Sequence, residues 1–526
     1  MNPSIASQPR AHDETNPPSA LDVSLRSHDL NADVAIIGGG LAGIACALAL
    51  ENTGLSIALL ERSDVLGGRA RSWRDNATGD VIDIGPHILL SEYHNMLDLL
   101  EMLGTREDVH WEKERFITLL DDHRHVSMKL HRLPAPLHLL PSLLKVSKLS
   151  VRDKLSNTKV TWLALRASEQ ELLRLDSMNG LELLERCGVS ARFRDWFWKT
   201  AALALLNLPL RECSAAALVR MYGQLIGVSA YRSGMPRRPL GELFVPKAQQ
   251  RLTANGARID FNAQVESIHA NRGRLQHLQL SDGRRVVPQV CVAAIPPQDL
   301  HRMIRSSGIA DIAWARNLTR FDPCPYISTY LWLDRKVTDE RFWSRVQSAG
   351  DLNSDFYDLS NIRVDIGSSR SLIASNSIYT THESLSDEEI IERTRRELID
   401  FTPRAGEARV QHAAVHRIDM AIPCPRPGTE TARPTTRTPL NGLLIAGDWT
   451  RTHLPSCMES AVYSGRIAAE EVAAALGRPA LTVALPRPDA DASVRFLRTL
   501  VPARRSIDRL LKSSGATRAI DPAYYE

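Results

Sequence analysis

Three glycines near the start of the chain, Gly38, Gly40 and Gly43, have the spacing G-x-G-x-x-G and lie between an apolar run and a helical pattern. The first glycine permits a tight turn, the second lets a pyrophosphate approach the backbone, and the third lets the helix pack on the strand. A helix that begins at Leu41 and Ala42 would direct free N–H groups and the positive end of its dipole at the phosphates. The spacing therefore predicts that this turn binds the pyrophosphate of a dinucleotide.

The flanking segments predict a βαβ unit that positions this turn. The apolar run 34–37 predicts a strand, the pattern 41–50 predicts a helix, and the run 56–60 predicts a second strand that ends at Glu61. Glu61 lies 18 residues beyond Gly43, where a carboxylate accepts hydrogen bonds from the ribose of a bound adenosine. The alternative is a glycine-rich turn in another α/β fold, and this unit alone does not choose between NAD and FAD.

The segment from Glu61 to Arg69, which includes Arg62, Gly67 and Gly68, continues directly from the second predicted strand. It resembles the continuation of the fingerprint in the flavin amine oxidase and carotenoid desaturase superfamily. The resemblance implies FAD, bound without a covalent link, and places these residues against it. Paired glycines let the backbone come close to a ligand, and a guanidinium can neutralise a pyrophosphate through two hydrogen bonds.

A second segment of the same kind lies near the other end of the chain. Gly447-Asp448-Trp449-Thr450 follows an apolar run, and Met458 begins a helical pattern that continues to residue 476. These residues resemble the C-terminal flavin motif of the superfamily, which implies that Asp448 bonds the ribityl chain and that the helix directs its N-terminus at the flavin. Such a helix dipole stabilises negative charge on the reduced ring. The resemblance also implies a backbone contact to the adenine side near Val265, and a Gly-Asp turn before an ordinary helix is the alternative.

Further segments resemble one branch of the superfamily, the squalene-associated desaturase-like flavoproteins or hydroxysqualene dehydroxylases, and their relatives the plant-type phytoene desaturases. The resemblance spans about residues 32–476. Its segments are Arg69–Trp73, Gly85–Leu90, Leu133–Leu137, Pro239–Phe244, and Gly447–Thr450 followed by Leu454-Pro455. It places Gly85, Pro86 and His87 near the flavin. Pro86 stands where Gln or Leu is expected in these subgroups, so the exact substrate stays open.

The resemblance implies an enzyme that acts on a long isoprenoid. As a hydroxysqualene dehydroxylase it would use reduced FAD to deliver hydride to an allylic carbon while hydroxide leaves, giving the squalene of hopanoid synthesis. Hydroxide is a poor leaving group and needs a proton donor, for which His87 is the candidate, against the alternative of a structural histidine. A phytoene-type desaturase would instead use oxidised FAD and need no acid. A flavin amine oxidase is less favoured because no aromatic cage is identified, and a lipid-binding flavoprotein without redox activity is the alternative outside enzymes.

Composition excludes several other classes. The chain has 526 residues, of which 43% are hydrophobic and 24% charged, as in ordinary globular proteins large enough for two joined domains. Lys and Arg number 65 against 61 Asp and Glu, so net charge does not indicate a nucleic-acid partner. The seven cysteines include no C-x-x-C pair, which predicts no metal site and fits a cytoplasmic protein. The first thirty residues lack the apolar region of a secretory signal, and no run reaches the roughly eighteen apolar residues of a spanning helix.

Residues 129–166 combine basic and apolar side chains. They contain eight Lys or Arg residues and one acid, Asp153, among leucines such as Leu137, Leu140 and Leu144. This pattern is typical of a segment that docks on an anionic membrane surface, through which a long isoprenoid could enter. A core helix with a solvated basic face is the equal alternative. The prediction is therefore a cytoplasmic protein that lies peripherally on a membrane.

The order of these segments predicts an α/β fold, in which a Rossmann-like FAD-binding domain of the GR2 flavoprotein type contains an inserted mixed α+β substrate domain. Strands are also predicted at 257–268, 290–295, 327–333 and 442–446, with a hairpin at Asp282-Gly283, and most of 104–235 is predicted helical. The predicted division is a disordered lead-in (1–30), three FAD-binding parts (31–90, 236–300, 438–477), a helical part that faces substrate and membrane (91–235), a second substrate part (301–437) and a C-terminal appendage (478–526).

Overall fold

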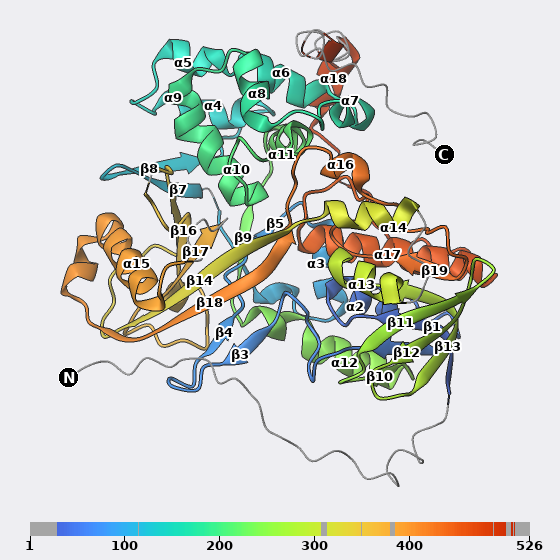
Figure 1. The fold of residues 1–526 in the computed structure, drawn as a ribbon. Coiled ribbons are helices and arrows are strands. Elements are labelled where there is room, and N and C mark those ends of the chain that lie inside the picture. Colours follow the sequence, from blue (N-terminus) through green and yellow to red (C-terminus); the bar gives the residue numbers. More distant parts are fainter. Residues whose placement is uncertain are drawn as a thin grey trace.

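The computed structural model describes residues 29–113, 115–306, 313–348, 350–378, 384–487, 489–500, 507, 508 and 510. Figure 1 shows three regions, with one sheet at the lower right, a second sheet at the left and a group of helices at the top. Residues 1–28 of the predicted lead-in lie outside the described residues.

The first sheet is assembled from segments that are far apart in the chain. Its strand order is β10-β2-β1-β13-β12-β11, with β19 paired to β13. Its parallel strands β10, β2, β1, β13 and β19 bring their carboxyl ends to one edge. The strand bounds are β1 (Leu30–Ile37), β2 (Ile57–Leu60), β10 (Arg258–Asp260), β11 (Val265–Asn271), β12 (Arg274–Leu280), β13 (Arg285–Ala293) and β19 (Leu443–Ile445). A nucleotide fold interrupted by long insertions is therefore confirmed.

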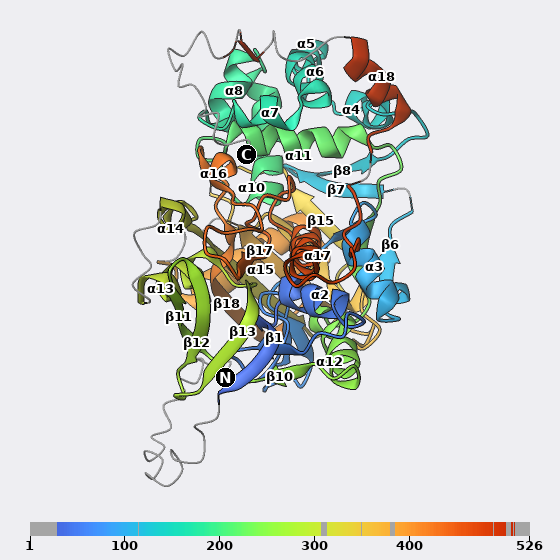
Figure 2. The ribbon, with the colours of Figure 1, turned by 90° about the vertical axis from the view of Figure 1, so that its right-hand side faces the viewer.

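Two helices from opposite ends of the chain pack beside this sheet. Helix α2 (Leu41–Ala49) contacts α17 (Met458–Ala475), and Figure 2 shows them side by side. A Cβ atom on Gly465 would lie 2.1 Å from the Ala42 carbonyl oxygen, so the absence of a side chain permits this close approach. The Glu459 carboxylate, buried in the first turn of α17, accepts hydrogen bonds from the backbone of α3 (His94–Met102).

The second sheet has the strand order β18-β14-β17-β16-β15-β7-β8. Helix α15 (Asp387–Phe401) packs on one of its faces, together with Leu331, Phe356 and Ile373. The opposite face packs Tyr330, Trp332 and Tyr357 against Ile82 and Met235, and so turns toward the nucleotide domain. The strand bounds are β7 (Arg115–Asp121), β8 (Arg124–Lys129), β14 (Pro323–Leu333), β15 (Phe342–Arg345), β16 (Asp355–Asp358), β17 (Leu372–Ile378) and β18 (Val410–Pro423).

Part of the region predicted to be helical is extended instead. Residues 109–129 contain β6 (Val109–Trp111) and the hairpin β7-β8, whose turn includes Asp122 in the left-handed conformation. The hairpin is held because β7 pairs with β15, a strand more than two hundred residues later. This distant pairing makes residues 115–129 extended, and the local sequence pattern does not indicate it. The remainder of the segment is mainly helical as predicted, except for β9 (Ser233–Pro236).

The upper helices enclose a separate apolar core that includes Trp196, Trp198 and Leu218. Helix α18 (Ala492–Leu500), in the predicted appendage, contacts α6. The other helices of this region are α4 (Leu140–Leu144), α5 (Val151–Ser156), α6 (Thr158–Arg166), α7 (Glu169–Leu173), α8 (Gly180–Arg186), α9 (Ala191–Phe193), α10 (Lys199–Leu206) and α11 (Ala215–Gly227). Within the described residues, no helix combines the length and the apolar character that crossing a bilayer requires.

The other predicted elements have mixed outcomes. The βαβ unit, the hairpin at Asp282-Gly283, the strands at 290–295, 327–333 and 442–446 and the helix from Met458 are confirmed within a few residues. The single strand predicted at 257–268 is wrong, because it is two strands with different partners. Strand β10 pairs with β2, whereas β11 pairs with β12.

Candidate functional site

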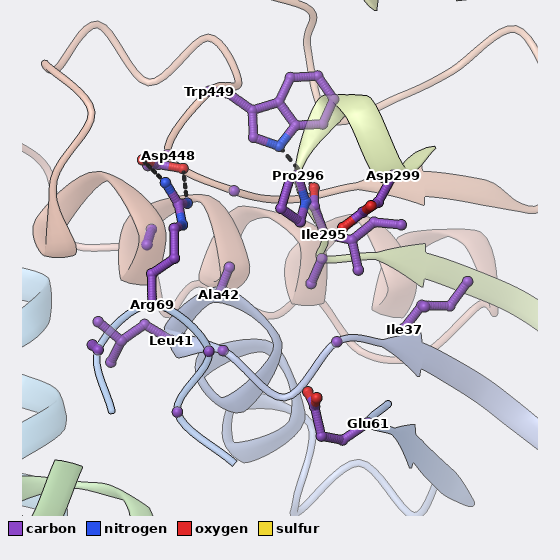
Figure 3. A pocket seen from close by; sticks show the side chains of 18 of the residues that line it. Ile37, Leu41, Ala42, Glu61, Arg69, Ile295, Pro296, Asp299, Asp448 and Trp449 are labelled. Atoms are coloured by element: carbon purple, nitrogen blue, oxygen red, sulfur yellow. Dashed lines mark hydrogen bonds and ion pairs between the residues drawn. The ribbon is translucent and has the colours of Figure 1, made fainter. Parts of the chain in front are cut away.

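A cavity of about 820 Å³ opens at the edge where the parallel strands of the first sheet end. Gly38 follows β1, Glu61 follows β2, Ala294 follows β13 and Gly447 follows β19, and all four residues line this cavity. Ligands of open α/β sheets bind at this edge, because the chain turns away there and leaves a crevice. The sheet therefore brings together segments from both ends of the chain around one site, as Figure 3 shows.

Each of the three positions of the first turn favours glycine for a different structural reason. Gly38 has a φ of +99°, and a Cβ atom on it would lie 2.6 Å from the Ala294 carbonyl oxygen. A Cβ atom on Gly43 would lie 1.9 Å from the Gly38 carbonyl oxygen, so glycine is required where α2 packs on β1. A Cβ atom on Gly40 would meet only the Gly68 Cα atom, at 3.9 Å, and would otherwise project into open space. This space is what a pyrophosphate needs beside the start of a helix.

Glu61 lies at the end of β2 with its side chain buried. Its Oε2 atom accepts a hydrogen bond of 2.7 Å from the Gly39 N–H, and Oε1 accepts one of 2.9 Å from the Ser63 N–H. A carboxylate offers about four acceptor positions, so two positions stay available to ribose hydroxyls. The same bonds fix the carboxylate against the glycine turn.

Arg69 and Asp448, which are 379 positions apart in the chain, form an ion pair at the cavity wall. Arg69 Nη2 lies 2.6 Å from Asp448 Oδ1, and Arg69 Nη1 also donates to the Ala421 carbonyl oxygen at 2.9 Å. Figure 3 shows the two side chains pointing toward one another above Leu41. The pair places a guanidinium and a carboxylate where the phosphates and the ribityl hydroxyls of a flavin nucleotide would meet them.

The loop after β19 is held by the residues around it. Gly447 has a φ of +143°, and its N–H donates to Ser464 Oγ in α17 at 2.8 Å. The indole N–H of Trp449 donates to the Ile295 carbonyl oxygen at 3.0 Å. These bonds connect α17 and the end of β13 through one loop, which presents Asp448 to the cavity.

His87 lines the cavity, and its ring is fixed by a short contact. Nδ1 lies 2.7 Å from the Gly85 carbonyl oxygen, so Nδ1 carries the proton and donates it. Burial lowers the pKa of His87 below its usual value, and the nearby Arg69 acts in the same direction. The ring is therefore neutral at physiological pH.

Most of the predicted site residues are brought together by the fold. Gly43, Gly85 and Pro86 do not line the cavity, although Gly43 supports its helix and Gly85 holds His87. The predicted residues that line the cavity are Gly38, Gly40, Leu41, Ala42, Glu61, Arg62, Gly68, Arg69, His87, Val265, Gly447, Asp448 and Met458.

Sequence reasoning missed two further walls of the cavity. Ile295, Pro296 and Asp299 line it, and Asp299 pairs with Arg62 at 3.3 Å. The Pro-Pro pair after a buried strand could have indicated this wall, because it lies at the same edge as the glycine turn. Ala421 and Ile422 come from the end of β18 in the other sheet, and no local signal marks them.

The cavity suits FAD by its shape and its donor set. Gly38 and Gly40 precede the N-terminus of α2, the Glu61 carboxylate stands where a ribose would lie, and a second helix begins at Met458 in the cavity wall. The walls near Ile84 and Ile88 are apolar and suit an isoalloxazine ring. The residues present would therefore suit both halves of the cofactor, and a bound flavin would supply the hydride chemistry.

Comparisons with known proteins show which family the chain resembles. Residues 41–473 match the family model described as flavin containing amine oxidoreductase. The chain is 27% identical over 478 residues to the 15-cis-phytoene desaturase of Narcissus pseudonarcissus, covering 86% of this chain and 82% of that protein. It is 25% identical to the 15-cis-phytoene desaturase of Synechococcus elongatus, covering 84% of this chain and 96% of the relative. A probable zeta-carotene desaturase of the same organism is 24% identical, covering 83% of this chain and 98% of the relative.

Solved structures show the same fold. Putrescine oxidase bound to putrescine has a TM-score of 0.66 at 17% identity, and the match covers 85% of this chain and 100% of that one. Cyclohexylamine oxidase from Brevibacterium oxydans has a TM-score of 0.63 at 18% identity, with the same coverage. The family match extends over most of the chain, from the start of α2 to α17, and includes the Gly-Asp loop. The chain therefore belongs to the flavin containing amine oxidoreductase family and is an FAD-dependent oxidoreductase.

Proposed function

We propose that this oxidoreductase acts on a long isoprenoid and desaturates it, with oxidised FAD as the hydride acceptor. The observation that carries the proposal is the similarity to phytoene and zeta-carotene desaturases over more than four fifths of the chain. The cavity supports it, because Ile84, Ile88 and Ile422 give an apolar surface beside the Gly-Asp loop. A hydrocarbon gains affinity mainly from such burial.

Reductive dehydroxylation of hydroxysqualene is the second candidate function, and it is favoured by Asp355, a buried carboxyl group on the same face of the second sheet as Tyr357, which turns toward the nucleotide domain. Burial raises the pKa of Asp355 to about 6, so this group keeps its proton closer to neutral pH than an exposed aspartate. A departing hydroxide needs such a donor. The pKa of His87, the candidate acid from the sequence, is lowered by burial, which favours a positioning role for that ring.

Mixing the holoenzyme with each substrate in the absence of oxygen distinguishes desaturation from dehydroxylation. Oxidised holoenzyme with phytoene in detergent should lose its flavin absorbance at a rate that depends on phytoene concentration, with a more unsaturated product seen by chromatography. Reduced holoenzyme with hydroxysqualene should stay reduced. The reverse pair of results, reoxidation with squalene formation and no reaction with phytoene, would establish dehydroxylation. Squalane, which has no allylic position, is the control ligand, and free FAD is the control for uncatalysed reaction.

We also propose that the upper helices dock on an anionic membrane surface, from which an isoprenoid reaches the enzyme. Large apolar side chains are exposed there, including Leu144 at 57%, Leu155 at 66% and Phe496 at 64%. The only acid of 129–166, Asp153, is buried in a capping box at the start of α5, so the exposed charges of this segment are basic. Figures 1 and 2 show α4, α5, α6 and α18 together at one end of the molecule. Exposed leucines among lysines suit anionic lipid head groups.

Vesicle sedimentation tests this surface. The holoenzyme should sediment with vesicles that contain phosphatidylglycerol, and the combined change Leu144→Asp and Leu155→Asp should lower the bound fraction about tenfold, because two buried apolar contacts are lost and like charges are added. Val364→Asp is the matched control, since Val364 is exposed at 56% but lies outside the helices. Equal binding of all three proteins would refute the proposed surface.

A further inference from the structure

A row of four polar side chains crosses the second sheet at one level. His416 on β18 faces Ser328 on β14, Ser328 faces Asn376 on β17, and Asn376 faces Asp355 on β16. Side chains that face one another across neighbouring strands lie about 5 Å apart, so the four form a continuous line. Asn376 is 3% exposed and Asp355 is 8% exposed. Sheet interiors rarely carry such a row without a partner for its polar groups.

This row lies on the face of the sheet that turns toward the flavin site. It shares that face with Tyr330 and Tyr357, which pack against Ile82, whereas α15 covers the opposite face. The glycine at position 85 is in contact with it. A Cβ atom there would lie 3.5 Å from Ser328 Oγ, and Gly85 accepts the hydrogen bond from His87, which lines the cavity.

The hydrogen bonds of the row are incomplete in a specific way. Asp355 accepts from the Tyr357 hydroxyl at 2.9 Å and from the Ser354 hydroxyl at 3.1 Å, and it also bonds the Asn376 side chain. Within the described part of the chain, Asn376 Oδ1 and His416 Nε2 have no partner. A buried polar atom without a partner is unfavourable, so these two atoms indicate a missing hydrogen-bonding group beside the row.

We propose that Asn376, His416 and Asp355 bind the hydroxyl group of an otherwise apolar isoprenoid alcohol on the face of the sheet that turns toward the flavin site. A hydroxyl group both donates and accepts, so it can donate to the Asn376 oxygen while it accepts from a neighbouring N–H. A ketone or quinone oxygen only accepts and leaves the Asn376 oxygen unpaired. A plain hydrocarbon leaves the Asn376 oxygen and His416 Nε2 without a partner among the described residues.

The inference rests on the proposed function and extends its second candidate, the dehydroxylation of an isoprenoid alcohol, because the row would recognise the oxygen of an alcohol. It does not require turnover. Burial lowers the pKa of His416, so its ring is neutral, and Trp73 packs edge-on against it at 4.9 Å between ring centroids. An indole in this position gives a fluorescence signal for occupancy of the row.

The test compares geranylgeraniol with the matching hydrocarbon that lacks the hydroxyl group, titrated into oxidised holoenzyme in detergent and followed by tryptophan fluorescence and flavin absorbance. The wild-type protein should bind the alcohol at least about tenfold more tightly than the hydrocarbon, because leaving one buried polar group unpaired costs at least about this factor. Asn376→Leu should bring the two dissociation constants together without weakening the hydrocarbon. His416→Phe, which keeps a flat ring, should have the same effect and serves if the first variant does not fold.

Ser375→Ala is the matched control. Ser375 is also buried on β17 with an unpaired hydroxyl among the described residues, but it is the neighbour of Asn376 and faces the other side of the sheet. The Ser375→Ala variant should prefer the alcohol over the hydrocarbon by the same factor as the wild type. Equal affinity of the wild type for both probes overturns the inference, as does a parallel loss of hydrocarbon binding in Asn376→Leu. Failure to reduce flavin with phytoene leaves the measured preference intact, so the inference and the proposed function fail separately.

Discussion

Gly40→Val yields a folded protein that does not retain FAD. Position 40 has a φ of −77° and a ψ of −178°, which any residue adopts, and a Cβ atom there would approach only the Gly68 Cα atom, at 3.9 Å. The apoprotein therefore accommodates the side chain. The branched methyl groups would occupy the space beside the helix N-terminus, so we expect FAD affinity to fall by about a hundredfold or more.

The measurement is the flavin absorbance of the purified variant, followed by titration of its apoprotein with FAD and a comparison of thermal unfolding between the two apoproteins. Apoproteins are compared because bound FAD would itself raise the unfolding temperature of the wild type. Gly367→Val is the control, since a Cβ atom on Gly367 meets no heavy atom within 4 Å and the residue lies outside the cavity. A yellow Gly40→Val protein with unchanged FAD affinity would contradict the assignment of this turn to the pyrophosphate.

The nucleotide half of the molecule could be predicted from sequence because its signals are local. Gly38, Gly40 and Gly43 lie within one turn, and the need for glycine at each position depends on a few neighbouring atoms. The Gly-Asp loop is equally local, and only its partner, Arg69, had to come from elsewhere. Sequence reasoning expected these two side chains to contact the cofactor, and the structure brings them within 2.6 Å of one another.

The substrate half could not be predicted to the same depth, because its site is made by register between distant strands. His416, Ser328, Asn376 and Asp355 come from four strands in different parts of the chain, and a shift of one residue in any pairing would turn that side chain to the other face. The β7-β8 hairpin joins the same sheet through the pairing of β7 with β15. The hydrophobic pattern within a single segment does not indicate which strands pair or in which register.

A buried ion cluster joins the upper helices to the flavin loop. Glu430, on α16 (Thr429–Ala432), pairs with Arg220 of α11 and, at 2.9 Å, with Arg433. Arg433 in turn donates to the Asp448 carbonyl oxygen at 2.8 Å. Burial would raise the pKa of Glu430, but Arg433 and Arg220 outweigh burial and hold it below its usual value. The carboxylate therefore neutralises two buried guanidinium groups and supports the backbone that presents Asp448.

Glu430→Gln should lower the free energy of unfolding by about 3–5 kcal/mol, because it removes the carboxylate that pairs with the buried Arg433 and leaves Arg220 with Glu169 alone among the described residues. Since the pKa of Glu430 is lowered in the folded protein, its contribution is complete above the usual glutamate pKa and is lost as the pH falls through the folded value. The difference between variant and wild type in urea unfolding should thus be large at pH 7.5 and should shrink as the solution is acidified. Glu471→Gln is the control, since its partner Arg437 is 72% exposed and such a pair contributes about 0–1 kcal/mol. A Glu430 variant as stable as the Glu471 variant at pH 7.5 would show that the cluster does not hold the flavin loop.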